Sequence, residues 1–473
     1  MPLHTANIVG SGPNGLAAAI TLAQKGVAVT VYERNAQVGG GATTAELTLP
    51  GFHHDVGSSV YPLGIASPFF RTLPLERFGL RFIQPKAALA HPFDDGTALT
   101  LEDDIEDTVA QLSARDGRAW RHLLEPLIED WETMIDQLLH PLLRFPRQPL
   151  GLLRFGLQGA MPAVMLAKMH FEDDRTRTLL AGCAAHSVLP LTWLGSSAAG
   201  LVLGASAHTT GWPIAEGGSQ SLSNALADYL LSLGGRIFLN ADIEDLAQLD
   251  RADVVLFDTG PQAVDRIAGQ VLTDSFRTRM RHFKYGPGAF KVDWALSEPI
   301  PWAASGCKRA ATVHLGGSMD EISYSEDQAF RGHHCLRPYV LLVQPSLFDP
   351  TRAPEGKHTA WAYCHAPYGS TVDLTRTIEA QVERFAPGFR ECILGRHTAG
   401  SKQLEAWNPN LVGGDITGGA MTVSQLVARP TAHLYRTSHA RVYLCSSSTP
   451  PGGGVHGMCG HLAALAALSD HAA

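Results

Sequence analysis

The sequence predicts an α/β fold in which a parallel sheet is divided by long insertions. Residues 6–9 form an apolar run typical of a buried strand, and residues 16–25 then have the spacing of a helix. Between them stands the pattern G-x-G-x-x-G, formed by Gly10, Gly12 and Gly15. A glycine turn between a strand and a helix is typical of the Rossmann-type site that binds a dinucleotide.

A second strand and an acidic residue complete this pattern. Residues 27–32 form another apolar run, which ends at Glu33. An acidic side chain about 20 residues after the second glycine can accept hydrogen bonds from both hydroxyls of an adenosine ribose. The first glycine permits the tight turn, the second lets the backbone approach the pyrophosphate, and the third lets the helix pack against the strand. The N-terminus of the helix presents free N–H groups to the anion.

Further glycines favour FAD over NAD as the dinucleotide. Three successive glycines, 39–41, follow soon after Arg34 and offer a second permissive loop to a long, extended cofactor. Near the other end, residues 442–444 form a last apolar run before a hydroxyl- and glycine-rich loop and an Ala/Leu helix. The N–H groups of that helix could face the N1/O2 edge of a flavin. An ordinary loop before a helix is the alternative, and it leaves the glycines at 452–454 unexplained.

Several motifs along the chain resemble those of a known protein family. The motifs GSGPNG, ERNAQVGGGATTAE, GFHHDVGSSVYP and PGGGVHGMCGHLAA resemble those of the phytoene desaturase-like FAD oxidoreductases. The likeness is closer to the branch named after the pyridine nucleotide-disulphide oxidoreductase domain-containing protein 2, on segments 285–302, 311–317, 356–369 and 408–420. The resemblance covers almost the whole chain. It implies a Rossmann-type FAD-binding domain of the amine oxidase and phytoene desaturase kind, with an inserted α+β substrate domain.

The glycine pattern and the resemblance together predict the residues that contact FAD. They are Gly10, Gly12, Pro13, Asn14, Gly15, Glu33, Arg34, Gly40, Gly41, Ala42, Ser58, Ile243, Ser447, Gly454, Val455 and His456. The chain departs from its relatives at residues 445–448, which read CSSS where many flavoenzymes carry glycine or an aspartate. Serine hydroxyls can donate hydrogen bonds to the same cofactor oxygens.

Two residues are candidates for catalysis, Lys291 and His456. Lys291 lies on an apolar strand and resembles the lysine of flavin amine oxidases that holds a water against N5; the alternative is an exposed strand lysine. Because a buried ammonium without a carboxylate partner is costly, we expect it to be neutral or bonded to water and flavin. His456 is an acid/base candidate or merely a loop histidine. Asp55 is expected to brace its turn.

The pocket and the domains are predicted as follows. His53, His54 and Tyr61 are candidates for lining the pocket. A discontinuous FAD-binding domain is predicted from residues 1–70, 205–265 and 430–473. Residues 71–204, mainly helical, and 266–429, mainly strands with long loops, would form the substrate domain.

Residues 137–171 are unlike the rest of the chain. They contain no acidic residue, and arginines and a lysine stand among many leucines, phenylalanines and methionines. The segment could rest in a membrane interface, cover an apolar substrate tunnel, or pack as ordinary core. Prolines that break any long amphipathic helix favour the second and third readings. In the second, Phe155 and Met165 would border the entrance to the flavin.

Composition limits the function classes. A formal net charge of −8 gives no reason to expect nucleic acid, and the seven cysteines form no C-x-x-C pair for zinc or a redox disulphide. The first predicted strand begins within six residues of Met1, so a cytoplasmic location without a signal peptide is expected. The predicted function is dehydrogenation of an apolar or amine-containing small molecule by hydride transfer to flavin N5. Polyene saturation, reduced-flavin isomerisation and a non-enzymatic, FAD-stabilised interaction protein are the alternatives.

Overall fold

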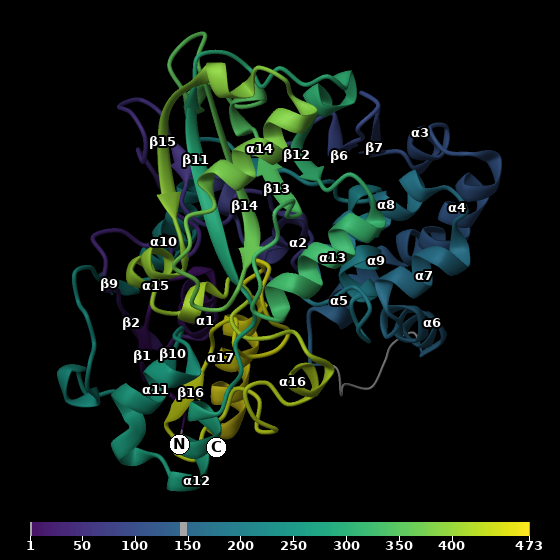
Figure 1. The fold of residues 1–473 in the computed structure, drawn as a ribbon. Coiled ribbons are helices and arrows are strands. Elements are labelled where there is room, and N and C mark those ends of the chain that lie inside the picture. The colour runs from purple at the N-terminus through teal and green to yellow at the C-terminus, as the bar shows by residue number, and fades with distance from the viewer. Residues whose placement is uncertain (1, 142–148, 473) are drawn as a thin grey trace.

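The first sheet contains five parallel strands in the order β16-β10-β1-β2-β9 (Figure 1). The computed structural model describes residues 2–141 and 149–472. The strands of this sheet are β1 (Thr5–Val9), β2 (Ala28–Tyr32), β9 (Arg236–Phe238), β10 (Val254–Phe257) and β16 (Val442–Leu444). Val9 is in register with both Tyr32 and Phe257, so the carboxyl ends of three strands meet beside the glycine turn.

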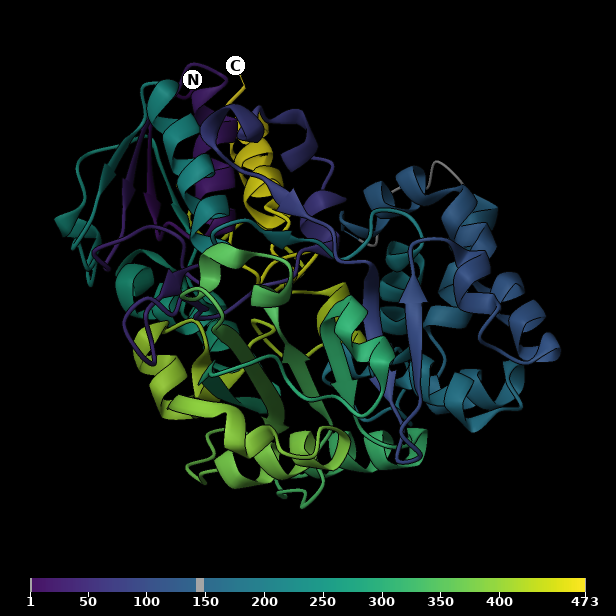
Figure 2. The same cartoon turned by 90° about the horizontal axis from the view of Figure 1, so that it is seen from above.

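Helices cover both faces of this sheet. On one face, α1 (Pro13–Ala23) lies between α10 (Ser219–Ser232) and α17 (Met458–Asp470), seen as purple, teal and yellow helices in Figure 2. A Cβ on Gly460 would overlap the backbone carbonyl of Asn14, so α17 approaches α1 closely because residue 460 is glycine. The other face packs against α11 (Pro261–Ala268), with α12 (Asp274–Arg281) beside it.

The second sheet is mixed and contains seven strands in the order β15-β11-β14-β13-β12-β6-β7. The strands are β6 (Ala87–Pro92), β7 (Ala98–Glu102), β11 (Gly288–Leu296), β12 (Ala310–Leu315), β13 (Val340–Val343), β14 (His358–Ala366) and β15 (Ile393–Ala399). Side chains alternate between its faces. Val292 and Trp294 belong to a core shared with α14 (Thr375–Phe385), whereas Lys291, Tyr363 and Leu341 face a cavity.

A helical region stands beside the β6–β7 edge of this sheet, in blue in Figures 1 and 2. Its helices are α3 (Ile105–Val109), α4 (Ala114–Glu129), α5 (Trp131–Leu138), α6 (Pro149–Gly159), α7 (Ala163–His170), α8 (Asp174–Ala184) and α9 (Ser197–Ala207). Helix α13 (Met319–Phe330) packs on α8. Shorter elements are β3 (Thr44–Ala45), β4 (His54–Asp55), β5 (Phe82–Ile83), β8 (Ile214–Ala215), α2 (Pro62–Ile65), α15 (Ser401–Trp407) and α16 (Val423–Val427).

The five strands of the first sheet all come from the three segments expected to form the FAD-binding domain. The mainly helical segment 71–204 also supplies β6 and β7 to the second sheet, which the sequence did not indicate. Every residue of β6 is buried, so its pattern has no alternation of apolar and polar positions. Periodicity alone cannot distinguish such a strand from a buried helical turn.

Candidate active site

A cavity of about 650 Å³ lies where the first sheet, the second sheet and the helical region meet. The glycine turn contributes Gly12, Pro13 and Asn14 to its lining, and the late loop contributes Gly453, Gly454, Val455 and His456. Lys291, Trp361 and Tyr363 line it from the second sheet, and Phe155 and Val202 from the helices. One cavity thus combines the predicted dinucleotide turn with an apolar chamber.

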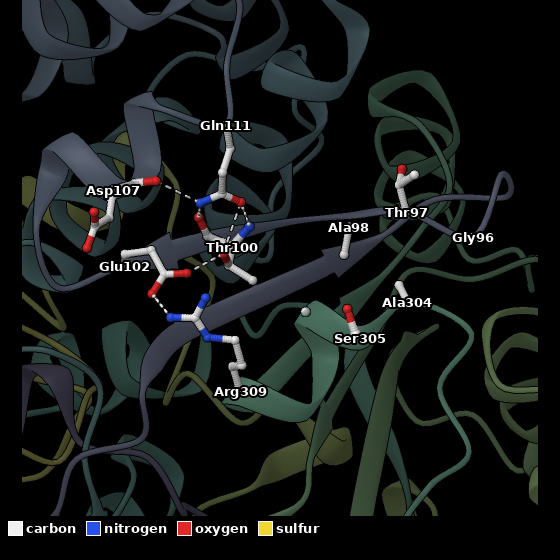
Figure 3. A pocket seen from close by; sticks show the side chains of 11 residues that line it. Gly96, Thr97, Ala98, Thr100, Glu102, Asp107, Gln111, Ala304, Ser305 and Arg309 are labelled. Carbon is white, nitrogen blue, oxygen red and sulfur yellow. Dashed lines mark hydrogen bonds and ion pairs between the residues drawn. The ribbon is translucent and has the colours of Figure 1, made fainter.

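A second cavity, of about 630 Å³, lies at the β7 edge and is shown in Figure 3. Its central polar groups are paired with one another. Glu102 accepts hydrogen bonds from Thr100 Oγ1 (2.6 Å) and Arg309 Nη2 (2.9 Å), and Gln111 bonds both to the backbone and to the side chain of Thr100. These groups are already engaged, so the first cavity is the candidate active site.

The three glycine positions of the turn leave no room for a Cβ atom. Gly10 has a φ of +97°, and a Cβ on Gly15 would overlap the carbonyl oxygen of Gly10. A Cβ on Gly12 would come within 2.5 Å of Oδ2 of Asp258. Gly40 also contacts this turn, because a Cβ there would lie 3.0 Å from Gly12 Cα. Gly12, Pro13 and Asn14 line the cavity, so a ligand there can reach the backbone at the point where α1 begins.

Glu33 is held beside this turn at the end of β2. It is buried, and its Oε2 accepts hydrogen bonds from the Ser11 amide (2.9 Å) and the Ser11 hydroxyl (2.7 Å). Its Oε1 accepts a hydrogen bond from the Asn35 amide (2.9 Å). These bonds fix the carboxylate, and each oxygen retains lone pairs for ribose hydroxyls.

The remaining predicted FAD contacts fall into two groups. Gly40, Gly41, Ser58 and Ser447 line the cavity, as do Gly12, Pro13 and Asn14 of the glycine turn and the residues of the late loop named above. Outside its lining lie Gly10, Gly15, Glu33, Arg34, Ala42 and Ile243. The first three of these shape the turn. Ile243 packs with Tyr32 and Phe257 at the end of the sheet, and Arg34 is exposed.

The late loop places His456 in the wall of the cavity. Val455 has a φ of +52° and Gly454 one of +133°, so the chain bends sharply before α17. His456 is 1% exposed; its Nδ1 accepts a hydrogen bond from the Met458 amide (3.1 Å), and its Nε2 has no partner among the described residues. Burial lowers the pKa of His456 to about 4, so the imidazole is neutral at pH 7. Because Nδ1 accepts, Nε2 carries the proton and can donate to a ligand.

Lys291 contacts a carboxylate, contrary to the expectation of a lysine without an acidic partner. Its Nζ atom pairs with Oδ1 of Asp293, and lies 5.0 Å from the centre of the Trp361 ring. The two partners are two residues apart on β11 and so lie on the same face. Burial opposes ionisation of Asp293, but Lys291 and the bond from His397 hold the pKa of that carboxyl below its usual range.

The three aromatic residues proposed to line the pocket do not do so. The cavity wall omits His53, His54 and Tyr61. His54 is buried behind the wall with its Nδ1 3.8 Å from Oδ1 of Asp293, and burial lowers its pKa to about 4. Tyr61 is fully buried and bonds to the Ser58 hydroxyl (3.2 Å). Contacts to the hydroxyls of Thr48, which lies 2.8 Å from Nε2 of His54, and of Ser58 hold these two side chains inside the protein rather than in the cavity wall.

Asp55 braces its turn, as expected. It accepts hydrogen bonds from the Ser219 amide (2.8 Å) and the Thr44 hydroxyl (2.8 Å), and it pairs with the buried Arg352 at 2.9 Å. The Arg352 guanidinium offsets the effect of burial and keeps the pKa of Asp55 below its usual range.

In the segment 137–171, Phe155 lines the cavity and is 8% exposed. Met165, expected at the same entrance, is 52% exposed on α7 and does not line it. The helix α7 is bent by 104° relative to α6, and no residue of α7 belongs to the cavity lining, which explains the difference. Residues 142–148 of this segment lie outside the described part of the chain.

Sequence reasoning missed several cavity residues. Asp258 follows β10 directly, and Trp361 and Tyr363 alternate along β14. His186 also lines the cavity, and its Nε2 lies 3.0 Å from Nε2 of the buried His314. The alternation in the segment HTAWAYCHA was a usable signal for the aromatic pair. The histidine pair joins residues 128 positions apart and has no local signal.

The site fits a flavin dinucleotide on its own chemistry. It combines three glycines whose positions leave no room for a Cβ, a fixed carboxylate at the end of β2, and a buried imidazole whose Nε2 has no hydrogen-bond partner among the described residues. The Asn14 side-chain oxygen is likewise buried without a partner among the described residues. Buried polar atoms without partners are costly, and a bound ligand would satisfy them.

Comparison with known proteins gives the same result. Residues 8–73 match the model of an NAD(P)-binding Rossmann-like domain. The chain is 26% identical to the pyridine nucleotide-disulfide oxidoreductase domain-containing protein 2 of Rattus norvegicus, over 99% of this chain and 94% of that protein. It is 23% identical to the phytoene desaturase (lycopene-forming) of Pseudescherichia vulneris, over 98% of each. A solved structure of a putrescine oxidase mutant has a TM-score of 0.64 at 16% identity, over 99% of each chain.

These findings confirm the predicted resemblance and the predicted fold class, and they support the predicted FAD cofactor and oxidoreductase activity. Along almost its entire length, the chain is similar in sequence to the phytoene desaturase and to the pyridine nucleotide-disulfide oxidoreductase domain-containing protein 2, and it shares its fold with the putrescine oxidase structure.

Proposed function

We propose that this protein is an FAD-dependent oxidoreductase that dehydrogenates a neutral, apolar small molecule. The observation that carries the proposal is the single cavity, which joins the glycine turn and the late loop to a chamber lined by aliphatic and aromatic side chains. When bound, the flavin supplies a two-electron acceptor.

The cofactor contacts are divided among the segments of the first sheet. Backbone N–H groups at the start of α1 would bind the pyrophosphate, and Glu33 would accept hydrogen bonds from the ribose. The loop before α17 would hold the ring, and Nε2 of His456, which has no partner among the described residues, would be the donor available to it. The glycines at 453 and 454 let that backbone come close.

The second sheet supplies the groups that act on the substrate side. Lys291 lines the cavity, and its ion pair with Asp293 fixes the position of Nζ. In this place it can hold a proton or orient a water molecule at the reacting atom. Trp361 and Tyr363 stack with an interplanar angle of 14°, and present aromatic surface against which an apolar molecule can lie.

The charges in the wall favour a neutral substrate over a cationic amine. Among the described residues that line the cavity, Asp258 is the only acidic one, and it lies within the glycine turn. Lys291 and Arg429 are the lysine and arginine side chains among the described residues of the lining. A protonated amine would meet cations without a carboxylate of its own, which costs free energy in a desolvated site. An amine could enter only in its neutral form.

The test is flavin bleaching under nitrogen. We expect purified protein to contain one FAD per chain, and its absorbance to fall on addition of polyenes or long-chain alcohols rather than charged diamines. Admission of air or a quinone should restore the spectrum. Stoichiometric NAD without flavin would contradict the proposal, and so would oxidised flavin that no apolar compound reduces. Turnover only by reduced protein would instead indicate saturation or isomerisation.

A further inference from the structure

Asp258 places an acidic side chain inside the glycine turn. Its amide donates to the Val9 carbonyl (2.8 Å), so the residue continues β10 beside the end of β1. Oδ2 accepts a hydrogen bond from the Gly15 amide (2.9 Å) and lies within 2.5 Å of the position of a Cβ on Gly12. The side chain also lines the cavity. The carboxyl group thus lies among the backbone groups expected to face a pyrophosphate.

An ionised carboxylate at this position opposes the ligand that the turn is built to bind. It occupies the Gly15 amide, one of the N–H groups at the start of α1. It also places a negative charge next to the two charges of a pyrophosphate, in a buried site where such repulsion is strong. A protonated carboxyl removes the charge and adds an O–H donor, which can bond to a phosphate oxygen.

We infer that Asp258 takes up a proton when FAD binds, and that its O–H group then donates to the pyrophosphate. FAD affinity therefore falls as the pH rises above neutrality. The inference rests on the FAD-binding part of the proposed function and adds a coupling between cofactor and proton. The proton comes from solvent and returns to it when FAD dissociates, so no other reactant is needed.

The groups around Asp258 favour this protonated state. Burial raises the pKa of its carboxyl to about 7; the backbone amides of Gly15 and Gly12 oppose the rise, and the charge of Glu33 adds to it. The thiols of Cys445 and Cys459 face it from the end of β16 and from α17, and burial raises the pKa of both, so they are neutral. The side-chain amide of Asn410 donates a hydrogen bond to the backbone carbonyl of Asp258 (3.0 Å) and not to its carboxyl group. Among these groups, only Glu33 acts on Asp258 with a charge, and that charge is negative. The negative charges of a bound pyrophosphate would raise the pKa of Asp258 further.

The first experiment measures FAD affinity between pH 6 and pH 9, by diluting the holoprotein and following the fluorescence of released FAD. The Kd of the native chain should rise about tenfold per pH unit above pH 7, since one proton is linked to binding. Asp258→Asn keeps the shape and the bond to Gly15 but cannot ionise. Its Kd should be independent of pH and at least tenfold lower than that of the native chain at pH 9.

Glu33→Gln is the matched control, because it removes the other acid beside the turn. It should weaken FAD binding at every pH and keep the slope. A slope in Asp258→Asn equal to that of the native chain would overturn the inference. A slope lost in Glu33→Gln but kept in Asp258→Asn would overturn it too, by assigning the proton to Glu33.

A second measurement needs no variant. Calorimetric titration of the native apoprotein with FAD at pH 8, in buffers of different ionisation enthalpy, counts the protons exchanged. Uptake of about one proton per FAD is expected. FAD binding without proton uptake would refute the inference alone. An apoprotein that binds no FAD even at pH 6 would refute the proposed function as well.

Discussion

Nζ of Lys291 and the carboxylate of Asp293 form a buried ion pair on one face of β11, directly beneath the cavity. Lys291 therefore has two roles, and a single substitution of the lysine would affect both at once. Lys291 can act at the reacting atom, and it also neutralises an acid that is itself inaccessible to solvent.

The first prediction uses both partners. Lys291→Met should slow flavin reduction or reoxidation at least tenfold, equivalent to about 1.4 kcal/mol in the barrier. It should also destabilise the fold by about 3 kcal/mol, because it leaves Asp293 buried without its ammonium. The double variant Lys291→Met/Asp293→Asn should recover most of the stability and none of the rate. Stopped-flow absorbance and denaturant unfolding measure the two effects, and full-rate half-reactions in either variant would remove Lys291 from the site.

The second prediction concerns the glycine turn. Gly12→Val should abolish FAD binding, because its Cβ would press against Oδ2 of Asp258 and its methyl groups would fill the place of the pyrophosphate. Heat-released flavin, measured by fluorescence, gives the FAD content. Gly156→Ala, where an added Cβ meets no atom within 4 Å, is the control and should retain full FAD. Normal flavin content in Gly12→Val would show that the cofactor lies elsewhere.

A third prediction follows from a buried histidine on β6. Burial alone lowers the pKa of His91 to about 3, and neither ring nitrogen has a partner among the described residues. Because the folded pKa lies below the unfolded value near 6.5, the unfolded chain binds the proton first as the pH falls. His91 therefore contributes stability above pH 6.5, and this contribution is lost as the pH falls toward the folded pKa.

His91→Leu should accordingly gain about 2 kcal/mol relative to the native chain between pH 7 and pH 5. The measurement is the free energy of unfolding in denaturant at both pH values with FAD in excess. His333→Leu, at an exposed position, should leave the pH dependence unchanged. Equal pH dependence in His91→Leu and the native chain would contradict the assignment.

A fourth prediction compares two apolar residues of the helical region. Phe155→Asp should lower turnover of an apolar substrate at least tenfold with FAD still bound, because it puts a carboxylate into the chamber wall. Met165→Asp should have no such effect, since that side chain is exposed outside the cavity. Steady-state kinetics and the flavin spectrum of both variants decide. Equal turnover in the two would place the substrate away from α6.

The outer face of the same region gives a fifth prediction. Leu150, Leu153 and Leu157 are 82%, 59% and 66% exposed and share one face of α6. No single helix in residues 2–141 and 149–472 has the length and hydropathy of a membrane span. Helices α6 and α7 have that length and hydropathy only when taken together, and the pair is bent by 104°. We propose that this face rests on a membrane surface rather than crossing it.

Native protein should then float with anionic liposomes, and Leu153→Asp/Leu157→Asp should not. Leu336→Asp changes a 91% exposed leucine elsewhere and serves as the control. Native protein that stays at the bottom of the gradient would show that this face of α6 does not bind a membrane surface.

Local patterns account for what could be predicted. The glycine turn, Glu33 and the late loop are each short segments whose residue types follow from backbone geometry, and the structure brings them to one end of one sheet. Asp258 could not be recognised in the same way. Its position depends on the parallel register of β10 with β1, which joins residues about 250 positions apart. Asp293, the partner of Lys291, could have been predicted, because residues two positions apart on a strand point to the same face.

The order of the strands has a consequence for synthesis of the protein. β10 lies between β1 and β16, and the ring-side loop follows β16, so the cofactor site needs both the earliest and the latest parts of the chain. The helical region and all seven strands of the second sheet leave the ribosome before residue 442 does. A nascent chain that ends before residue 442 lacks β16, the loop after it and α17, which complete both the cavity lining and the core shared with the helical region. A chain truncated before residue 442 should therefore be isolated without bound flavin, as a colourless protein.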